Sequence, residues 1–530
     1  MPDPTILVVG SGNAGFCAAL SAAESGIPGS SILLIDKCPE DWAGGNSYFT
    51  AGAFRATHDG LTDILPIVNN VDAQTAAHID LPAYTESEFL SDLKRVTEGR
   101  SSPDLGAVLV GESNAAVKWL HALGVRFQLS FNRQAYRVNG RFKFWGGLCL
   151  KTQDGGKGLI SDLSAAAKQR GIRVHFSTAL TSITTDPSTG RITGARVQHA
   201  TGREDALSCT ALVLAAGGFE ANPRLRAQYL GPGWDLAHVR GTPYNTGECL
   251  SLCLDALHAR SAGHWSGCHS VAWDAASPPA SGNRSVSNEF TKSGYPLGVM
   301  LNAHGRRFVD EGIDFRNFTY AKFGRAILEQ DGGVAFQVWD KKGAGMLREE
   351  EYRADVVERI TADSIDELAA KCAAKGLQSE ERFVETIRAF NEAVYAFREE
   401  NPEVVFDPAV KDGLGTRFAK RGLEIPKSNW ARALDEPPFL AVKVTCGITF
   451  TFGGLAVRPD TAGVVSETTG REVEGLFCAG EMVGGLFYGN YPGGSGLTSG
   501  TVFGRRAGRA AAELVKRSGE GGKGTTQAKI

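Results

Sequence analysis

Long apolar segments are absent from this chain of 530 residues. Since no run of about 18 uncharged apolar residues occurs, we expect no membrane-spanning helix. A large excess of one charge is absent too, because 56 basic residues stand against 59 acidic ones and the net charge is −3. This balance provides no basic surface of the kind that nucleic acids require, and it argues against a nucleic-acid partner.

Paired cysteines are also missing. The ten cysteines are scattered and form no CxxC motif, so we expect reduced thiols rather than disulfides or a metal site. A strand is predicted from Thr5, which leaves no room for a signal or transit peptide and favours a cytoplasmic protein. The final residues, Ala528-Lys529-Ile530, resemble a relaxed peroxisomal tripeptide, so the peroxisome is the minor alternative.

Glycine, in contrast, is abundant. It accounts for 65 residues, and the glycines cluster beside predicted strands. The first cluster, Gly10-Ser11-Gly12-Asn13-Ala14-Gly15, lies between an apolar strand and an alanine-rich helix, and a second apolar strand then ends in Asp36. In this order Gly10 allows a tight turn, Gly12 allows close approach of a pyrophosphate, and Gly15 allows the helix to pack on the strand. The segment therefore predicts a dinucleotide site, with Asp36 on the ribose hydroxyls.

Glycine clusters next to apolar segments recur later in the chain. The glycine-bearing segments are Gly44-Gly45-Asn46-Ser47, Ala215-Ala216-Gly217-Gly218, Gly453-Gly454, Ala479-Gly480-Glu481 and Tyr488–Gly500. Between about 265 and 440 the glycine clusters thin out, and charged amphipathic helices are predicted at Arg348–Glu358 and Glu380–Glu400.

We therefore predict an α/β fold with an inserted domain. Residues 1–265 and 441–516 form a Rossmann-like domain with a parallel sheet and an inserted β-meander. Residues 266–440 form an α+β capping domain that binds substrate. A last helix covers Thr501–Lys516, and residues 517–530 form a flexible tail.

With these motifs in place, the chain resembles the FAD-binding flavoproteins of the fumarate reductase and succinate dehydrogenase superfamily over residues 5–515. Four stretches look most like its tricarballylate dehydrogenase branch: Gly44–Ser47 with Arg55 and His58, Trp265–His269, Cys446–Gly454, and Tyr488–Leu497. The element Tyr491-Pro492-Gly493 is also similar to that of the 3-ketosteroid dehydrogenases.

The resemblance implies that FAD is the cofactor, and it implies which residues hold it. These are Gly10, Gly12, Asn13, Ala14, Gly15, Asp36, Lys37, Gly44, Gly45, Asn46, Ser47, Ala216, Gly217, Gly218, Gly480, Glu481, Ser495, Gly496 and Leu497. The histidine that carries covalent flavin in succinate dehydrogenases has no counterpart near Trp42–Ser47, so we expect FAD to be bound non-covalently.

Three of four polar groups expected from the fumarate reductases are changed. The region Lys292–Asn302 has no arginine to serve as proton donor, the clamping histidine falls near Thr449 or Phe450, and the late clamping arginine falls near Tyr491. His269 remains in the early position. We therefore do not expect a fumarate or succinate enzyme.

The sequence instead predicts an FAD-dependent dehydrogenase acting on a CH–CH bond next to a carboxylate or carbonyl, with a small, tricarballylate-like polycarboxylate as substrate. A base takes a proton from the α carbon while hydride passes from the β carbon to flavin N5. Candidate catalytic residues are Tyr491, His269 and Tyr295, and candidate substrate-binding residues are Arg55, His58 and Thr449.

Several alternatives stay open. The same motifs suit an enoate or enone reductase, since one site catalyses both directions, and they suit a 3-ketosteroid-type dehydrogenase. A different class is the flavin subunit of an electron-transfer complex or a non-catalytic binder, in which any iron–sulfur relay would lie on another chain. Oxygen, a quinone or a partner protein could accept the electrons. Because no second nucleotide motif occurs, direct use of NAD(P) is not expected.

Overall fold

The computed structural model describes residues 3–418 and 423–524, and the statements below concern these residues. The chain divides into two compact units. Unit 1 comprises Met1–Leu230, Gly241–Cys268 and Phe450–Ile530, and unit 2 comprises Gly231–Arg240 and His269–Thr449. The predicted capping domain, residues 266–440, covers most of unit 2. The unit differs from that prediction in taking the short segment before Gly241 and in running on to Thr449.

The core of unit 1 is a six-stranded sheet in the order β20-β21-β13-β1-β2-β9. Its strands are β1 (Ile6–Val9), β2 (Ile32–Ile35), β9 (Arg173–His175), β13 (Ala211–Leu214), β20 (Gly463–Val465) and β21 (Glu472–Cys478). All the pairings are parallel except that of β20 with β21. The central strands β1, β2 and β13 are buried at every position, which suits their uninterrupted apolar sequences.

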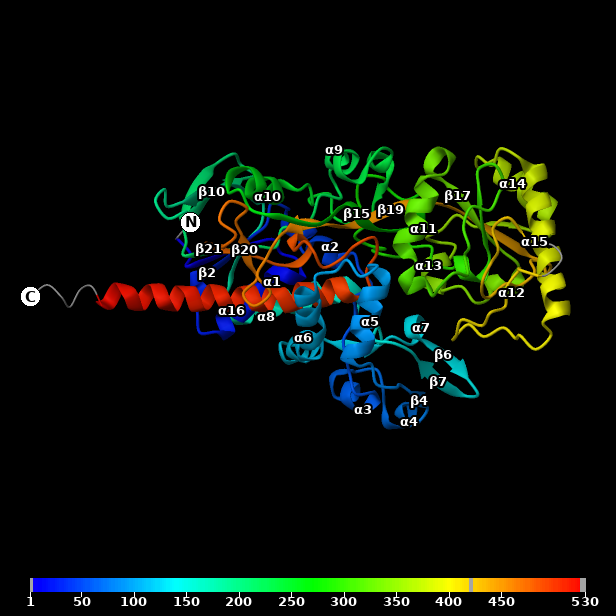
Figure 1. Ribbon diagram of the computed structural model, residues 1–530, viewed down its shortest axis with the longest axis horizontal. Helices are drawn as coiled ribbons and strands as arrows, with labels where there is room; N and C mark the ends of the chain where they lie inside the picture. The colour runs from blue at the N-terminus through cyan, green and yellow to red at the C-terminus, as the bar shows by residue number, and fades with distance from the viewer. Residues whose placement is uncertain (1–2, 419–422, 525–530) are drawn as a thin grey trace, which may run out of the picture. The chain divides into compact units, whose positions relative to one another are not determined.

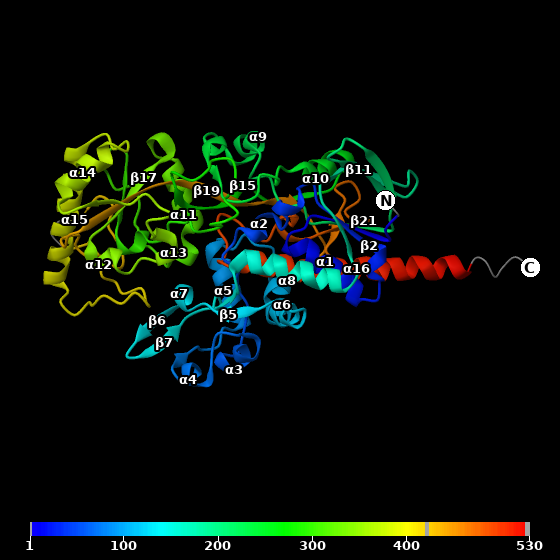
Figure 2. The same ribbon diagram turned by 180° about the vertical axis from the view of Figure 1, so that it is seen from behind.

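Two helices from opposite ends of the chain pack together beside this sheet. Helix α1 (Asn13–Glu24) lies along α16 (Ser495–Gly524), as Figure 1 shows in blue and red and Figure 2 shows from behind. Glycines make this close contact possible: a Cβ on Gly504 would lie 2.6 Å from Ala14 O, and one on Gly508 would lie 2.2 Å from Ala18 O. The N-terminal and C-terminal segments of the fold are therefore joined backbone to backbone.

The predicted β-meander is confirmed as a three-stranded antiparallel sheet, made of β10 (Thr178–Thr185), β11 (Ile192–His199) and β12 (Glu204–Ser208). The turn between the first two strands is closed by Asp186, whose carboxylate accepts hydrogen bonds from the backbone N–H groups of Ser188 and Thr189. The hydrogen bond from Ser188 Oγ, followed by these backbone hydrogen bonds, lowers the pKa of Asp186 to about 2.

The rest of unit 1 consists of short elements. Its helices are α2 (Gly45–Tyr48), α3 (Leu61–Ile64), α4 (Ala73–Ala76), α5 (Glu86–Val96), α6 (Pro103–Ala122), α7 (Phe131–Gln134), α8 (Gly155–Gln169), α9 (Pro223–Leu225) and α10 (Glu248–Ser251). Its small sheets are formed by β3 (Ala53–Phe54), β5 (Phe127–Leu129) and β8 (Leu150–Thr152), and by β4 (Ile79–Asp80), β6 (Ala135–Val138) and β7 (Arg141–Phe144).

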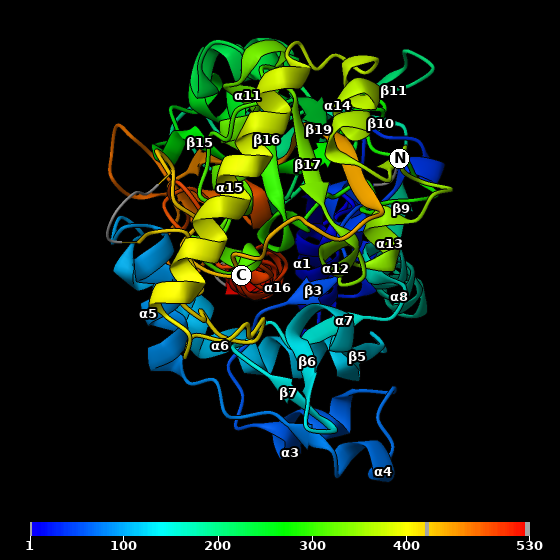
Figure 3. The same cartoon turned by 90° about the vertical axis from the view of Figure 1, so that its right-hand side faces the viewer.

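Unit 2 is built on a second sheet. Its strands are β14 (His238–Val239), β16 (Val299–Asn302), β17 (Ala335–Trp339), β18 (Ile360–Ala362) and parts of β15 (Ser261–Asp274) and β19 (Phe439–Leu455). Its helices are α11 (Tyr320–Leu328), α12 (Lys341–Ala344), α13 (Glu349–Tyr352), α14 (Ile365–Ala373) and α15 (Glu380–Glu400), and Figure 3 shows α15 in front of the strands.

Two helix predictions in unit 2 had different outcomes. Helix α15 is confirmed with its predicted bounds, and Ser379 caps it by accepting a hydrogen bond from Arg382 N. The predicted helix at Arg348–Glu358 was too long, because α13 ends at Tyr352 and its C-cap, Arg353, takes an extended conformation. The run of charged residues there continued a helical pattern that the backbone does not follow.

The last helix is longer than predicted at both ends. It begins at Ser495 rather than Thr501, and it continues past Lys516 to Gly524. Each added residue extends a helix by one hydrogen bond, so scattered glycines weaken the helix without ending it. The tripeptide Ala528-Lys529-Ile530 lies outside the described residues. Within residues 3–418 and 423–524, no helix has the length and apolarity needed to cross a membrane.

The contact between α1 and α16 predicts a strong difference between two glycine substitutions. Gly508→Ala places a methyl group against the backbone oxygen of Ala18, so we expect the free energy of unfolding to fall by about 1–3 kcal/mol. Gly519→Ala is the matched control on the same helix, since no atom lies within 4 Å of its added Cβ and alanine favours the helix. Urea unfolding followed by circular dichroism measures both. Equal stability of the two variants would contradict this packing.

Candidate functional site

The predicted dinucleotide motif forms a tight turn between β1 and α1. Gly10 has a φ of 110°, and a Cβ there would lie 2.2 Å from Ala215 O. A Cβ on Gly15 would lie 1.9 Å from Gly10 O. Both positions therefore require glycine, for the turn and for the close packing of α1. Asp36 completes the motif: its Oδ2 accepts hydrogen bonds from Ser11 N and Ser11 Oγ at 2.8 and 2.7 Å.

Helix α2 brings a second predicted segment to this turn. Gly44 N donates to Ser11 Oγ at 3.1 Å, and Asn13 N donates to Ser47 Oγ at 3.1 Å. Gly12 and Gly45 face each other across open space, since a Cβ on Gly45 would be 4.0 Å from Gly12 Cα. Half-buried backbone with open space beside it suits a cofactor that lies against the chain.

Three further predicted segments converge here. Asn13 Nδ2 donates to Leu497 O at 2.9 Å, which ties the first turn of α16 to α1. Ala216 N lies 3.3 Å from the sulfur of Met482, beside Glu481. A Cβ on Gly218 would lie 2.2 Å from Glu481 Oε1, so the glycine pair after β13 leaves space for this carboxyl.

The residues that the resemblance assigned to FAD all lie in unit 1. Lys37 is also there and donates to Thr246 Oγ1 and Glu248 Oε1 at 2.5 and 2.6 Å. Ser495 lies buried at the start of α16, where its hydroxyl donates to Pro492 O at 2.6 Å. The fold thus brings segments far apart in the sequence to one edge of the sheet, with exposed backbone and a helix N-terminus, and this arrangement fits a dinucleotide.

Sequence reasoning missed one buried acid in this region. Glu220 follows the Gly217-Gly218 pair and has no exposed surface. Its Oε1 accepts hydrogen bonds from the side-chain amides of Asn46 and Asn245. An acidic residue two positions after a glycine pair that follows a buried strand is the signal that could have identified it.

Aromatic rings gather next to the start of α16. Phe450, Phe452, Phe487 and Tyr491, the aromatic cluster, lie with ring centroids 5.3–6.3 Å apart. A Cβ on Gly496 would meet Tyr491 Cε2 at 3.7 Å and Phe450 Cε1 at 3.9 Å. The candidate Tyr491 therefore lies against the helix start that was predicted to border the flavin, within an apolar wall.

Arg55 and His58, which were predicted to bind substrate carboxylates, have structural partners instead. Arg55 is 1% exposed and donates from Nε to Gly493 O at 2.9 Å and from NH1 to Tyr84 OH and Asp92 Oδ2 at 2.9 and 3.2 Å. His58 Nδ1 accepts a hydrogen bond from Gly60 N, and burial lowers the pKa of His58. Arg55 thus holds the loop before α16, and the His58 ring lies 6.3 Å from that of Tyr84, so both side chains have structural partners in this fold.

Tyr295 also has a different place from the predicted one. It is fully buried in the core of unit 2, with its ring 4.5 Å from that of Phe323 and its hydroxyl 2.7 Å from Thr319 Oγ1. Burial raises the pKa of Tyr295 far above its ordinary value. A side chain in this position cannot reach a substrate without unpacking the core, so Tyr295 is a packing residue.

His269 and Thr449 are brought together in unit 2, and an unpredicted arginine joins them. The three residues belong to neighbouring strands: Arg240 follows β14, Thr449 lies in β19, and His269 lies in β15. Arg240 NH1 donates to Thr449 Oγ1 at 3.1 Å, and its guanidinium lies 5.5 Å from the ring centroid of Trp273. Burial, and then the charge of Arg240, hold the pKa of His269 well below its ordinary value. We call these three residues the cationic triad.

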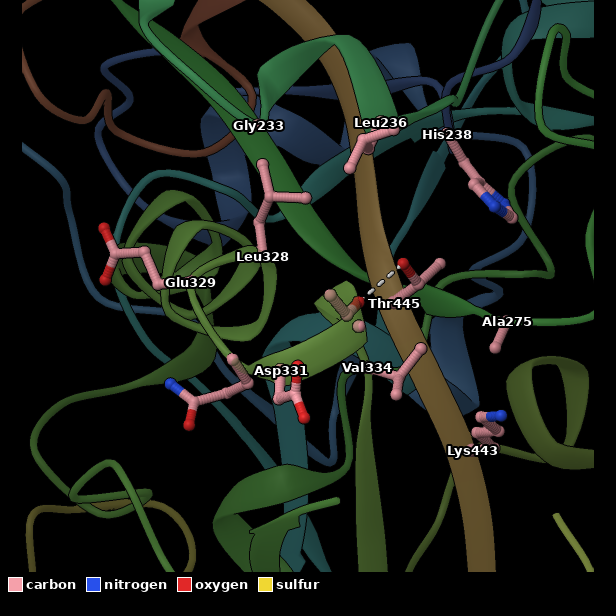
Figure 4. Close-up of a pocket in the computed structure, with 13 residues that line it drawn as sticks. Gly233, Leu236, His238, Ala275, Leu328, Glu329, Asp331, Val334, Lys443 and Thr445 are labelled. Atoms are coloured by element: carbon pink, nitrogen blue, oxygen red, sulfur yellow. Dashed lines mark hydrogen bonds between the residues drawn. The ribbon is translucent and has the colours of Figure 1, made fainter. Parts of the chain in front are cut away.

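Unit 2 also has a surface cavity of about 430 Å³, shown in Figure 4. It is lined by Leu236, His238, Leu328, Asp331 and Lys443 among others, and Thr445 Oγ1 donates to Gly333 O across it at 2.9 Å. None of the predicted site residues lines it. Among the described residues, no group of His, Cys, Asp and Glu is placed to hold a metal ion.

The structural role of Arg55 leads to a testable prediction. Arg55→Gln removes the buried guanidinium from Asp92 and leaves neutral Tyr84 as a buried donor to this carboxylate, so we expect the free energy of unfolding to fall by roughly 2 kcal/mol or more. Arg95→Gln is the matched control, because Arg95 pairs with the same carboxylate from an exposed position and should contribute less than about 1 kcal/mol. Urea unfolding measures both. Unchanged stability in Arg55→Gln, together with a raised KM, would restore Arg55 to substrate binding.

Comparison with known proteins agrees with this geometry. The family model described as "FAD binding domain" matches residues 5–497. A probable fumarate reductase of Shewanella frigidimarina (strain NCIMB 400) is 26% identical over 516 residues, which cover 96% of this chain and 74% of that protein. The 4-oxocyclohex-2-ene-1-carboxylate 5-dehydrogenase of Sinomonas cyclohexanicum is 25% identical over 600 residues, with 98% and 95% coverage.

Among solved structures, the open conformation of a flavocytochrome c3 fumarate reductase has a TM-score of 0.70 at 23% identity, covering 97% of this chain and 79% of that one. This likeness confirms the predicted fold class. The family match spans nearly the whole chain and includes the glycine turn, α2 and the start of α16. The chain therefore belongs to the FAD-binding-domain family of fumarate reductase-like flavoproteins, and it is an FAD-dependent oxidoreductase that acts on CH–CH or C=C bonds.

Proposed function

We propose that this oxidoreductase removes two hydrogens from a C–C bond next to a carboxylate, and that its substrate is a small, tricarballylate-like polycarboxylate. The cationic triad carries this proposal, because it places a guanidinium, a hydroxyl and a neutral imidazole together on adjacent strands. FAD, when bound by unit 1, supplies the acceptor for the hydrogen that leaves as hydride.

Arg240 is the proposed carboxylate ligand. A guanidinium presents N–H donors in a planar fork that matches the two oxygens of a carboxylate. Thr449 Oγ1, 3.1 Å from Arg240 NH1, orients that fork and offers a further hydroxyl. Arg240 thus takes the part that sequence analysis gave to Arg55 and His58.

His269 is the proposed base. Its low pKa keeps the imidazole neutral at pH 7, and a neutral imidazole can accept a proton. A carboxylate bound at Arg240 adds a negative charge nearby, which raises the pKa of His269 and makes it a stronger base. As the proton leaves the α carbon, negative charge moves to the carboxylate oxygens, where Arg240 stabilises it. Binding and proton removal are therefore coupled through one cation.

A second candidate substrate is a ring that carries a ketone. The aromatic cluster favours it, since four aromatic side chains beside Gly496 offer an apolar surface rather than charged ligands. One relative is named for a substrate that carries an oxo group and a carboxylate on the same ring. In this case Tyr491 is the proposed hydrogen-bond donor to the ketone. The reverse reaction, reduction of an enoate or enone, would use the same groups.

The proposed electron acceptor is oxygen, a quinone or a partner protein. The chain shows one dinucleotide motif, at Gly10–Gly15, which the FAD site uses. This favours an acceptor other than a nicotinamide nucleotide.

Anaerobic reduction of the bound flavin distinguishes the two candidate substrates. We expect tricarballylate, and more weakly other polycarboxylates such as succinate, to bleach the flavin absorbance, because the cationic triad recognises a carboxylate. Ketosteroids and simple cyclic enones serve as the comparison. Bleaching by ketones alone would move the assignment to the second candidate. If none of these compounds reduces or reoxidises the flavin, the proposed substrate class is wrong.

Replacing Arg240 tests the carboxylate site directly. We expect Arg240→Gln to raise KM for an acid substrate by about tenfold or more, since a charge-assisted contact is lost. Removing the positive charge also moves the pKa of His269 up towards its ordinary value, so the variant should lose activity on acidification at a higher pH than the wild type.

The matched control for Arg240→Gln is Arg325→Gln. Its guanidinium also lies over a tryptophan of unit 2, 5.3 Å from the ring centroid of Trp234, but it is not part of the cationic triad. Steady-state kinetics across pH measure both variants. Equal KM values and superimposable pH profiles for the two variants would remove Arg240 from substrate binding.

A further inference from the structure

Two carboxyl groups meet beside the FAD-binding segments of unit 1. Glu220 lies in the loop after β13 and has no exposed surface, whereas Glu481 is half-buried. The two side chains lie within hydrogen-bonding reach of each other. Two ionised carboxylates only repel at such a distance, so a hydrogen bond between them requires that one carries a proton.

The surrounding donors are divided between the two acids. Glu220 Oε1 accepts from Asn46 and from Asn245, the latter at 2.5 Å. Glu481 Oε1 accepts from Thr451 N and Thr451 Oγ1 at 2.7 and 2.9 Å. Glu220 Oε2 is buried and receives no donor from the described part of the chain. An oxygen in that situation is satisfied if it bears the shared proton and donates it.

Burial decides which acid keeps the proton. Glu220 is the deeper group, and burial followed by the charge of Glu481 raises its pKa well above the ordinary glutamate value. Burial raises the pKa of Glu481 to about 7, and its hydrogen bonds with Thr451 and Glu220 oppose that rise. A nearby cation, Arg226, donates from NH1 to Glu220 backbone O at 2.5 Å. The proton therefore belongs on Glu220.

We propose that Glu220 is a positioning residue that stays protonated, donates a hydrogen bond to Glu481 and so fixes two residues of the FAD site, Glu481 and Asn46. The Asn46 amide is held at both ends, since its Oδ1 accepts from Thr242 N at 2.8 Å while its Nδ2 donates to Glu220. Above its pKa of about 7, Glu481 carries one negative charge and has one defined orientation. The pair as a whole carries a single charge rather than two.

This assignment predicts that glutamine can replace Glu220 but not Glu481 without weakening FAD binding. In Glu220→Gln the new amide reproduces the protonated carboxyl, because its oxygen can accept from both asparagines and its NH₂ can donate to Glu481. In Glu481→Gln the new amide instead places a second donor against the protonated Glu220. We therefore expect Glu220→Gln to keep FAD affinity within about threefold of wild type. Glu220→Ala and Glu481→Gln should each weaken FAD binding by roughly tenfold or more.

The test combines infrared spectroscopy with FAD titration. In the wild-type holoenzyme and in the FAD-free protein, at a pH well above 7 where Glu481 is ionised, we expect a C=O band of a protonated carboxyl that is absent from Glu220→Gln. The quenching of FAD fluorescence gives the affinities. Glu351→Gln is the control variant, since Glu351 is a buried acid of unit 2 that accepts from Arg348 NH1 at 2.9 Å, and the band should persist in it.

Stability across pH provides a readout that packing alone would not change. The unfolded chain releases the Glu220 proton near the ordinary glutamate pKa, while the folded chain retains it. The stability of the wild type relative to Glu220→Gln should therefore decline as the pH rises above that value. Absence of the protonated band in wild type would overturn the proposal, and so would equal loss of FAD affinity in Glu220→Gln and Glu481→Gln. Neither result depends on the substrate, so the proposed reaction is tested separately.

Discussion

Contact between bare backbones is the constraint on which unit 1 depends. The strand β1, the turn after it and helix α1 can meet only because Gly10 and Gly15 have no side chains, since a Cβ on Gly15 would fall 1.9 Å from Gly10 O. Missing side chains also allow α1 and α16 to pack closely at Gly504 and Gly508. Backbone at this edge is consequently left uncovered by side chains, and that is the property a pyrophosphate site needs.

Features that depend on neighbours in sequence were predictable. The strand, glycine turn, helix and Asp36 form one local unit, and each glycine has a steric reason that the motif already contains. Helix α15 was found with its bounds because its apolar residues recur at helical spacing and Ser379 provides a cap. The fold class followed from this unit, and the predicted buried strand before Gly217-Gly218 is β13, which pairs with β1 in the same sheet.

Roles that depend on distant partners were not predictable. Arg55 looked like a ligand for a carboxylate, yet Asp92 and the backbone of Gly493 already use its donors. No sequence pattern singled out Arg240, because its partners Thr449 and His269 come from other strands. Spacing identifies a residue that can carry charge, but only the fold decides whether that charge is already neutralised.

The distribution of polar groups also limits the chemistry. In unit 1 Lys37 is paired with Glu248, Glu481 lies beside Glu220, and Tyr491 lies among phenylalanines. Unit 2 supplies Arg240 next to a neutral His269. Charge recognition is therefore concentrated in unit 2, and apolar contact in the aromatic cluster of unit 1.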